Sequence, residues 1–148
     1  MSRKTVHQEV ESIKHDIDTV WNVVSDFPAV TTWIPSVSHC TVQGEGIGSI
    51  RTVTQAGMSF QEQLEFLDSS SHTISYRILD PTPFPMTGFH GTIHLERLSA
   101  GTTRLTWTAD AESVDDEGMK VVGPVMDQFI KTSIAGLEAN LSHSHSAN

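Results

Sequence analysis

The sequence has a single cysteine, few basic residues and no long apolar run, and each shortage excludes a class of protein. Cys40 cannot form an internal disulfide, and there is no second thiol to complete a thiolate metal site. No segment approaches the ~18 consecutive apolar residues of a transmembrane helix, and the N-terminal stretch MSRKTVHQEV lacks the apolar region of a signal peptide. Nine basic against eighteen acidic residues give a formal net charge of -9, which repels nucleic acid and anionic lipid headgroups. We therefore expect a cytoplasmic protein with no nucleic-acid partner and no stable membrane insertion.

The length and composition predict one globular domain. A chain of 148 residues is long enough to bury its own core, and a hydrophobic content of 37% is ordinary for a folded protein. The only compositionally biased segment lies at the C-terminus. We expect a single domain over residues 1–141 and a flexible tail over 142–148. The choice between a monomer and a homodimer stays open.

The first third of the chain predicts a strand followed by two short helices. Residues 4–13 alternate as a strand does. Asp16 is a favourable N-cap for a first helix, which Pro28 stops. A second short helix fits residues 29–33.

The remainder predicts an antiparallel meander and a long final helix. Six strands are expected over 37–43, 49–55, 58–67, 72–79, 87–98 and 102–112. Gly123 and Pro124 introduce a helix over 125–141. Its apolar stripe contains Val125, Met126, Phe129, Ile130, Ser133, Ile134 and Leu137.

Alternation along the strands separates an apolar face of the sheet from a polar one. The apolar face holds Met58, Phe60, Leu64, Phe66, Ile74, Tyr76, Ile78, Phe89, Gly91, Ile93, Leu95, Leu105, Trp107 and Ala109. Glu62 is the only carboxylate on this face, so its burial requires a partner. A two-residue turn at Ala56 and Gly57 places Arg51 opposite Glu62. The pair is either a polar site that orients or acts on a ligand, or an ion pair that only fixes register or lies in water at the sheet end.

Small and aromatic residues on the apolar side favour a cavity over a filled core. Four inward positions carry small residues where a filled core prefers large ones: Gly91, Ala109, Ala111 and Ser133. Flat apolar walls are expected from Trp33, Phe60, Tyr76, Phe89, Trp107 and Phe129. Taken singly, each aromatic residue is also compatible with ordinary core packing.

The segment DPTPFPMTG, residues 80–88, combines three prolines with two apolar side chains, Phe84 and Met86. We interpret it as a stiff lid over the cavity, because proline restricts the backbone and apolar residues are unusual on a surface loop. The alternative is a proline-rich connection whose apolar residues cap the core.

The histidines do not form a metal triad in the predicted fold, and no metal site is expected. Only His39 lies near the cavity wall, in a short strand that leaves its orientation ambiguous.

The chain resembles the START-like and birch-pollen-allergen-like helix-grip superfamily, and within it the polyketide cyclase/dehydrase group. The resemblance rests on the block VWNVVSDFPAVTTWIPSV, followed by QGEGIGSIRTV, in the predicted order of elements. It implies an α+β fold with a curved antiparallel sheet of about seven strands wrapped around a long C-terminal helix, and two short helices between the first two strands. It also implies that Arg51 and Glu62 line an internal cavity.

These observations lead us to expect a protein that binds a small hydrophobic or aromatic molecule without a cofactor. The expected ligand contacts are Trp33, Val53, Phe60, Ile78, Phe84, Phe89, Trp107, Val125, Phe129 and Ser133. As a cyclase, dehydratase or isomerase of secondary metabolism, the protein would use Arg51 to stabilise enolate charge, and Glu62 or Tyr76 to move a proton. The alternatives are a non-catalytic carrier or sensor of a hydrophobic molecule or lipid, and a structural protein with a filled interior.

Overall fold

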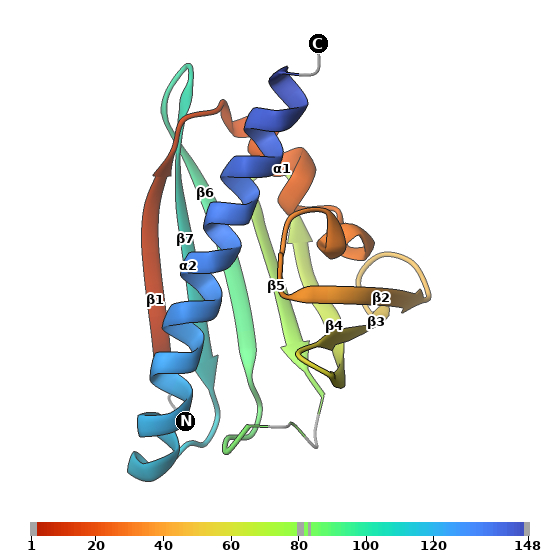
Figure 1. Ribbon diagram of the computed structural model, residues 1–148, viewed down its shortest axis with the longest axis vertical. Coiled ribbons are helices and arrows are strands. Elements are labelled where there is room, and N and C mark those ends of the chain that lie inside the picture. Colours follow the sequence, from red (N-terminus) through yellow and green to blue (C-terminus); the bar gives the residue numbers. More distant parts are fainter. Residues whose placement is uncertain (1–2, 80–81, 83, 147–148) are drawn as a thin grey trace.

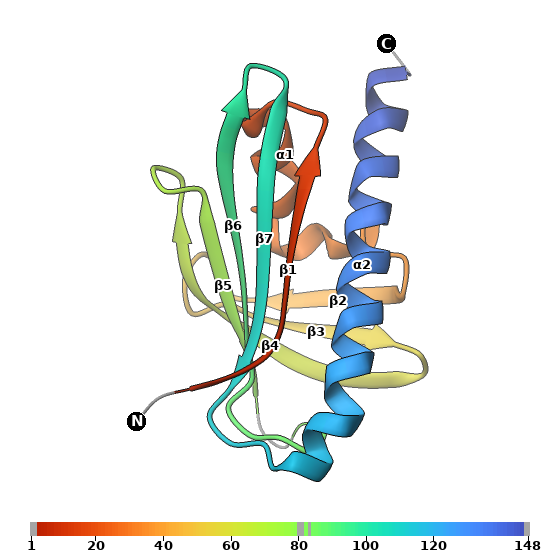
Figure 2. The ribbon, with the colours of Figure 1, turned by 90° about the vertical axis from the view of Figure 1, so that its left-hand side faces the viewer.

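The computed structural model describes residues 3–79, 82 and 84–146, apart from the side chains of 143–146. The elements in chain order are β1 (Lys4–Ile13), α1 (Ile17–Val24), the 3-10 helix η1 (Phe27–Thr32), β2 (Val37–Gln43), β3 (Ile50–Gln55), β4 (Met58–Asp68), β5 (Thr73–Ile78), β6 (His90–Ser99), β7 (Thr102–Ala111) and α2 (Asp116–Ser146). The strands form one antiparallel sheet in the order β1-β7-β6-β5-β4-β3-β2. The sheet curves around α2, while α1 and η1 lie at one end (Figures 1 and 2). This confirms the predicted α+β architecture.

The two short helices are set by a cap and a proline. The side chain of Asp16 accepts a hydrogen bond from the Thr19 backbone N–H at 3.2 Å, as expected of an N-cap. α1 ends at Val24, and Pro28 lies in the first turn of η1 rather than at the end of α1. Proline fits this position because first-turn N–H groups have no partner within the helix. The second helix therefore begins at Phe27, two residues earlier than predicted.

The β3–β4 hairpin has the predicted register. Ala56 and Gly57 both adopt positive φ angles, 52° and 78°, as a tight two-residue turn between twisted strands requires. Arg51 consequently pairs with Glu62. Met58, expected to point inward, is 43% exposed because it lies at the tip of the hairpin.

A bulge in β4 overturns one inward assignment. The register of β4 against β5 shifts between Leu64 and Phe66, so alternation breaks at this point. Phe66 is 46% exposed, while Leu67 packs against the core. Residues on the N-terminal side of the bulge keep their predicted faces, with Glu62 and Leu64 buried.

Helix α2 is longer at both ends than predicted. It begins at Asp116 because Asp115 caps it, with its side chain accepting from the Gly118 N–H at 2.7 Å. Pro124 lies inside the helix rather than at its start, and the backbone stays helical to Ser146. The extra N-terminal turns add Val122 to the buried stripe, whereas Val125 is 42% exposed. None of the helices in the described part of the chain is long and apolar enough to span a bilayer.

The packing of α2 on the segment after η1 depends on Gly136. A methyl group at this position would overlap the carbonyl oxygen of Trp33 and the ring of Pro35. One turn further along, the Asn140 side chain donates to the Thr32 carbonyl at 3.0 Å. The two contacts lock α2 against the end of the short helices.

We predict that Gly136→Ala destabilises the fold by about 1–3 kcal/mol, the usual range for overpacking, despite the higher helix propensity of alanine. Gly123→Ala is the matched control, because a methyl there meets no atom within 4 Å apart from its chain neighbours and the backbone of its own helix. Alanine at position 123 gains helix propensity, but Pro124 disfavours the helical backbone conformation of the residue before it, and the two effects oppose each other. Thermal unfolding of both variants tests this, and equal melting temperatures would contradict the proposed close contact.

Candidate functional site

The centre of the site is a buried ion pair between neighbouring strands. Arg51 on β3 donates from Nε to Glu62 Oε1 on β4 at 2.7 Å, and its Nη2 lies 2.6 Å from the same oxygen. The two residues are only 6% and 7% exposed. The pair therefore faces the interior, and the alternative of an ion pair in water at the sheet end is excluded.

Arg51 is held on its other sides by η1 and β5. Its Nη1 donates to the Phe27 carbonyl oxygen at 2.8 Å. The guanidinium carbon lies 4.1 Å from the centroid of the Phe27 ring and 5.2 Å from that of Tyr76, within the range of cation–π attraction. All three guanidinium nitrogens are thus engaged. This geometry favours a role for Arg51 in fixing Glu62 over the predicted direct contact with ligand charge.

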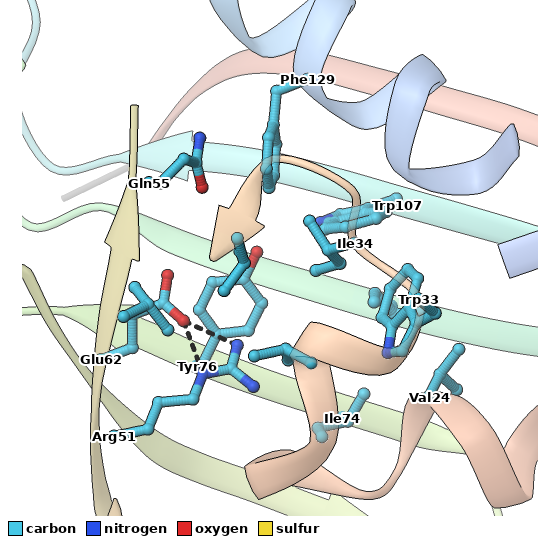
Figure 3. A pocket seen from close by; sticks show the side chains of 14 residues that line it. Val24, Trp33, Ile34, Arg51, Gln55, Glu62, Ile74, Tyr76, Trp107 and Phe129 are labelled. Carbon is cyan, nitrogen blue, oxygen red and sulfur yellow. Dashed lines mark hydrogen bonds and ion pairs between the residues drawn. The ribbon is translucent and has the colours of Figure 1, made fainter. Parts of the chain in front are cut away.

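Glu62 uses only one of its carboxylate oxygens for this ion pair. Both Arg51 contacts go to Oε1, and no hydrogen bond to Oε2 occurs within the described residues. Figure 3 shows the side chain at the wall of the pocket, with the second oxygen turned away from Arg51. Oε2 is therefore a hydrogen-bond acceptor available to a molecule in the cavity.

Tyr76 lies beside the ion pair as a protonated phenol. Burial raises its pKa well above the usual range, and the neighbouring Glu62 charge adds to this effect. Its ring rests on Gly91, its cross-strand partner, where a methyl group would overlap the ring. The small residue at Gly91 therefore accommodates Tyr76 and does not create the open space that we expected.

Two small internal cavities meet at these residues. Each has a volume of about 30 Å³. The first is lined by Val24, Val30, Trp33, Ile34, Val37, Arg51, Val53, Gln55, Glu62, Ile74, Tyr76, Ile93, Trp107 and Phe129 (Figure 3). The second is lined by Gln55, Phe60, Glu62, Tyr76, Ile78, Phe84, Phe89, Trp107, Ala109, Met126, Phe129 and Ile130. A volume of this size is comparable to that of one water molecule, so an aromatic ligand requires side chains to move.

An apolar groove on the surface adjoins the cavities. It has a volume of about 400 Å³ and is lined by Ser36, Gln55, Pro124, Val125, Gln128, Phe129 and Thr132. Gln55 and Phe129 line the groove and both cavities, so these two side chains separate the surface from the interior.

Eight of the ten predicted ligand contacts line the cavities, namely Trp33, Val53, Phe60, Ile78, Phe84, Phe89, Trp107 and Phe129. Val125 does not, because it lies on the outer groove. Ser133 is buried away from the cavities and its hydroxyl donates to the Phe129 carbonyl of its own helix at 2.7 Å. Sequence reasoning missed Gln55, although it shares the inward alternation of Arg51 and Val53.

The predicted lid segment is described only in part, since Asp80, Pro81 and Pro83 lie outside the described residues. Phe84 lines the second cavity and packs edge-on against Phe60, with ring centroids 6.3 Å apart. Met86 is buried. Phe84 therefore covers part of the second cavity, whereas Met86 belongs to the core.

The histidines whose side chains the structure describes lie away from the cavities. His39 is exposed, which removes it from the cavity wall. One cluster of potential metal ligands in the described part of the chain was missed. His7 Nε2 lies 3.0 Å from Glu9 Oε1 and 3.3 Å from Asp127 Oδ1, between β1 and α2. The three residues are half-buried, and Lys131 already forms an ion pair with Asp127 at 2.8 Å.

Comparisons with known proteins agree with this fold. The profile of a family described as "Polyketide cyclase / dehydrase and lipid transport" matches residues 4–142.

A protein from Thermobifida fusca has 23% identity and a TM-score of 0.82, over 97% of this chain and 95% of that one. The Zhui aromatase/cyclase from a Streptomyces species has 18% identity and a TM-score of 0.80, over 95% and 94%. A point mutant of norcoclaurine synthase from Thalictrum flavum has 17% identity and a TM-score of 0.77, over 99% of each chain. At these identities the solved structures establish the helix-grip fold alone.

The raised pKa of Tyr76 predicts a loss of stability at high pH. The unfolded chain loses its phenol proton near pH ~10, while the folded state keeps it, so stability falls as pH rises above that value. Tyr76 is the only tyrosine, and ultraviolet titration therefore reports this group alone. We expect no phenolate in the native protein at the pH where the tyrosine of the denatured protein is half ionised. In Tyr76→Phe, the part of the stability loss at high pH that comes from tyrosine ionisation should be absent. Half-ionisation of the native protein near pH ~10 would contradict the burial of the phenol.

Proposed function

Because the chain belongs to the family of polyketide cyclases, dehydrases and lipid transport proteins, we propose that it encloses a small, largely apolar molecule and moves a proton on it. The proposed chemistry is of the cyclase or dehydratase kind and uses no metal or nucleotide cofactor. The reacting molecule would lie between the sheet and α2, where the cavities adjoin Glu62.

The observation that carries the proposal is the uncommitted oxygen of Glu62. A buried ion pair adds little to stability over well-packed apolar residues of similar volume. Here the pair places a fixed carboxylate oxygen, Oε2, in a mostly apolar wall. A carboxylate oxygen that no protein donor occupies can accept a proton from a ligand placed against it. Glu62 is thus suited to act as a general base.

Each neighbouring group supports one part of a proton transfer. Glu62 would remove a proton from a carbon next to a carbonyl group of the ligand. The Tyr76 phenol, which its raised pKa keeps protonated even above the usual range, would donate a hydrogen bond to the resulting enolate oxygen. Arg51 holds the base in place, and the indole of Trp107 and the ring of Phe129, 5.8 Å apart, provide flat walls that orient the reacting atoms.

Ligand binding in this account requires the interior to open. Phe60, Phe84 and Phe129 are only partly buried, unlike the fully buried Trp107 behind them. Rotation of Phe129 and Gln55 would join the outer groove to both cavities. A ligand would therefore enter between α2 and the tip of the β3–β4 hairpin.

A carrier function is the second candidate, and the outer groove favours it. The groove is lined mainly by apolar atoms and leads to the cavities past Gln55 and Phe129. A carrier would use this path for uptake and release of its ligand and would leave the molecule unchanged.

Turnover by a Glu62→Gln variant distinguishes the two functions. Native mass spectrometry of protein from its own host identifies the co-purifying molecule, and incubation with that molecule shows whether it is transformed. For an enzyme, Glu62→Gln should lower turnover by about 10²-fold or more while the ligand still raises the melting temperature.

Glu96→Gln is the matched control, since Glu96 also faces an arginine, Arg104, across a hairpin but lies on the exposed side of the sheet. It should leave turnover unchanged. Recovery of the ligand unaltered from the wild-type protein would exclude the enzymatic function in favour of a carrier. Unchanged turnover in Glu62→Gln would remove Glu62 from the mechanism.

A further inference from the structure

Trp33 has a buried hydrogen-bond donor that the protein leaves without a partner. The residue is 4% exposed, and its indole Nε1–H makes no hydrogen bond to any described residue. An indole can only donate, so nothing but an acceptor atom satisfies it. An unpaired buried donor costs about 1–3 kcal/mol. Trp33 lines the first cavity, so a molecule in that space could supply the missing acceptor.

Trp33 is held in place by contacts of its backbone and of its ring. Trp33 follows η1, and its backbone N–H donates to the Val30 carbonyl at 3.3 Å. Gly136 of α2 packs directly against its carbonyl oxygen. Its ring lies against Trp107, with centroids 5.7 Å apart. The backbone of Trp33 is therefore held by η1 and α2, and its ring packs against Trp107.

The other polar groups of the first cavity lie on the opposite side. Figure 3 shows Glu62 at one end of the pocket and Trp33 at the other, with Tyr76 and Ile34 between them. The Trp107 indole is already paired with the Tyr76 hydroxyl. The cavity thus has a free acceptor, Glu62 Oε2, at one end and a free donor, Trp33 Nε1–H, at the other.

We propose that Trp33 is a specificity-determining residue that selects ligands with an acceptor oxygen at the end remote from Glu62. The matching class is a flat apolar molecule with the reacting group beside Glu62 and a separate carbonyl oxygen at the far end, which accepts from Trp33 Nε1–H. In a non-reacting probe, a hydroxyl group takes the place of the reacting group and donates to Glu62 Oε2. This inference rests on the proposed function, because it requires the cavity to admit a ligand.

Two probes of nearly equal shape test the role of the carbonyl group. para-Hydroxyacetophenone has the hydroxyl and the carbonyl, whereas para-ethylphenol has the same ring and hydroxyl without the carbonyl. One satisfied hydrogen bond to a buried donor predicts about tenfold tighter binding of the ketone by the wild-type protein. Isothermal titration calorimetry measures both affinities.

Variants of two tryptophans test whether the preference for the ketone depends on Trp33. Trp33→Phe removes the donor and keeps an aromatic ring, so the ketone should bind only as well as para-ethylphenol. Trp21→Phe is the matched control, because Trp21 is a buried tryptophan of α1 that does not line the cavity. It should keep the preference for the ketone. A preference that survives in Trp33→Phe would overturn the inference.

The indole N–H signals of the wild-type protein give a second test, which does not depend on whether a variant folds. The chain has three tryptophans and therefore three indole N–H signals in a proton–nitrogen correlation spectrum. The Trp33 signal should move downfield with the ketone and not with para-ethylphenol. Equal affinities and an unmoved Trp33 signal would overturn the inference while leaving the proposed function intact. Failure of both probes to bind would also overturn it, whereas the proposed function is judged separately by the co-purifying molecule and its turnover.

Discussion

A guanidinium and a carboxylate buried together on the concave side of the sheet form the contact on which the interior depends. Arg51 joins three parts of the fold: β4 through Glu62, the start of η1 through the Phe27 carbonyl, and β5 through the ring of Tyr76. Removing either charged partner would leave the other buried and unpaired, at a cost of about 3–5 kcal/mol. Apolar residues could fill the same volume with similar stability. The ion pair instead places a polar group at a fixed position and leaves Glu62 Oε2 without a hydrogen-bond partner among the described residues.

The surrounding side chains make this oxygen the polar end of a mostly apolar interior. Tyr76 stays protonated beside it, because burial raises the phenol pKa, and Trp33 provides a lone donor at the far end. Each cavity measures only about 30 Å³, so the size of any ligand is set by how far the half-buried aromatic rings move. The sheet fixes Glu62 and Tyr76, and the segment after η1 carries Trp33. The partly buried rings, Phe129 among them, are the side chains that would move to admit a ligand.

Most of the fold and the centre of the site could be predicted from alternation and turn chemistry. The two-residue turn alone sets the pairing of Arg51 with Glu62, because a slip of one residue would turn the apolar side chains outward. Long-range features escaped prediction. The bulge that exposes Phe66 has no signature in the alternating pattern, and Pro124 signals a helix start in a helix whose true cap, Asp115, lies nine residues earlier. The unpaired indole N–H of Trp33 is a property of packing and cannot be inferred from residue type.

A crystal structure of the protein with its co-purifying molecule tests the central claim most directly. The account predicts that the molecule lies between the sheet and α2, with a polar atom within hydrogen-bonding distance of Glu62 Oε2 and with Arg51 still bound to Oε1. A molecule confined to the outer groove, or bound inside with no polar contact to Glu62, would contradict it.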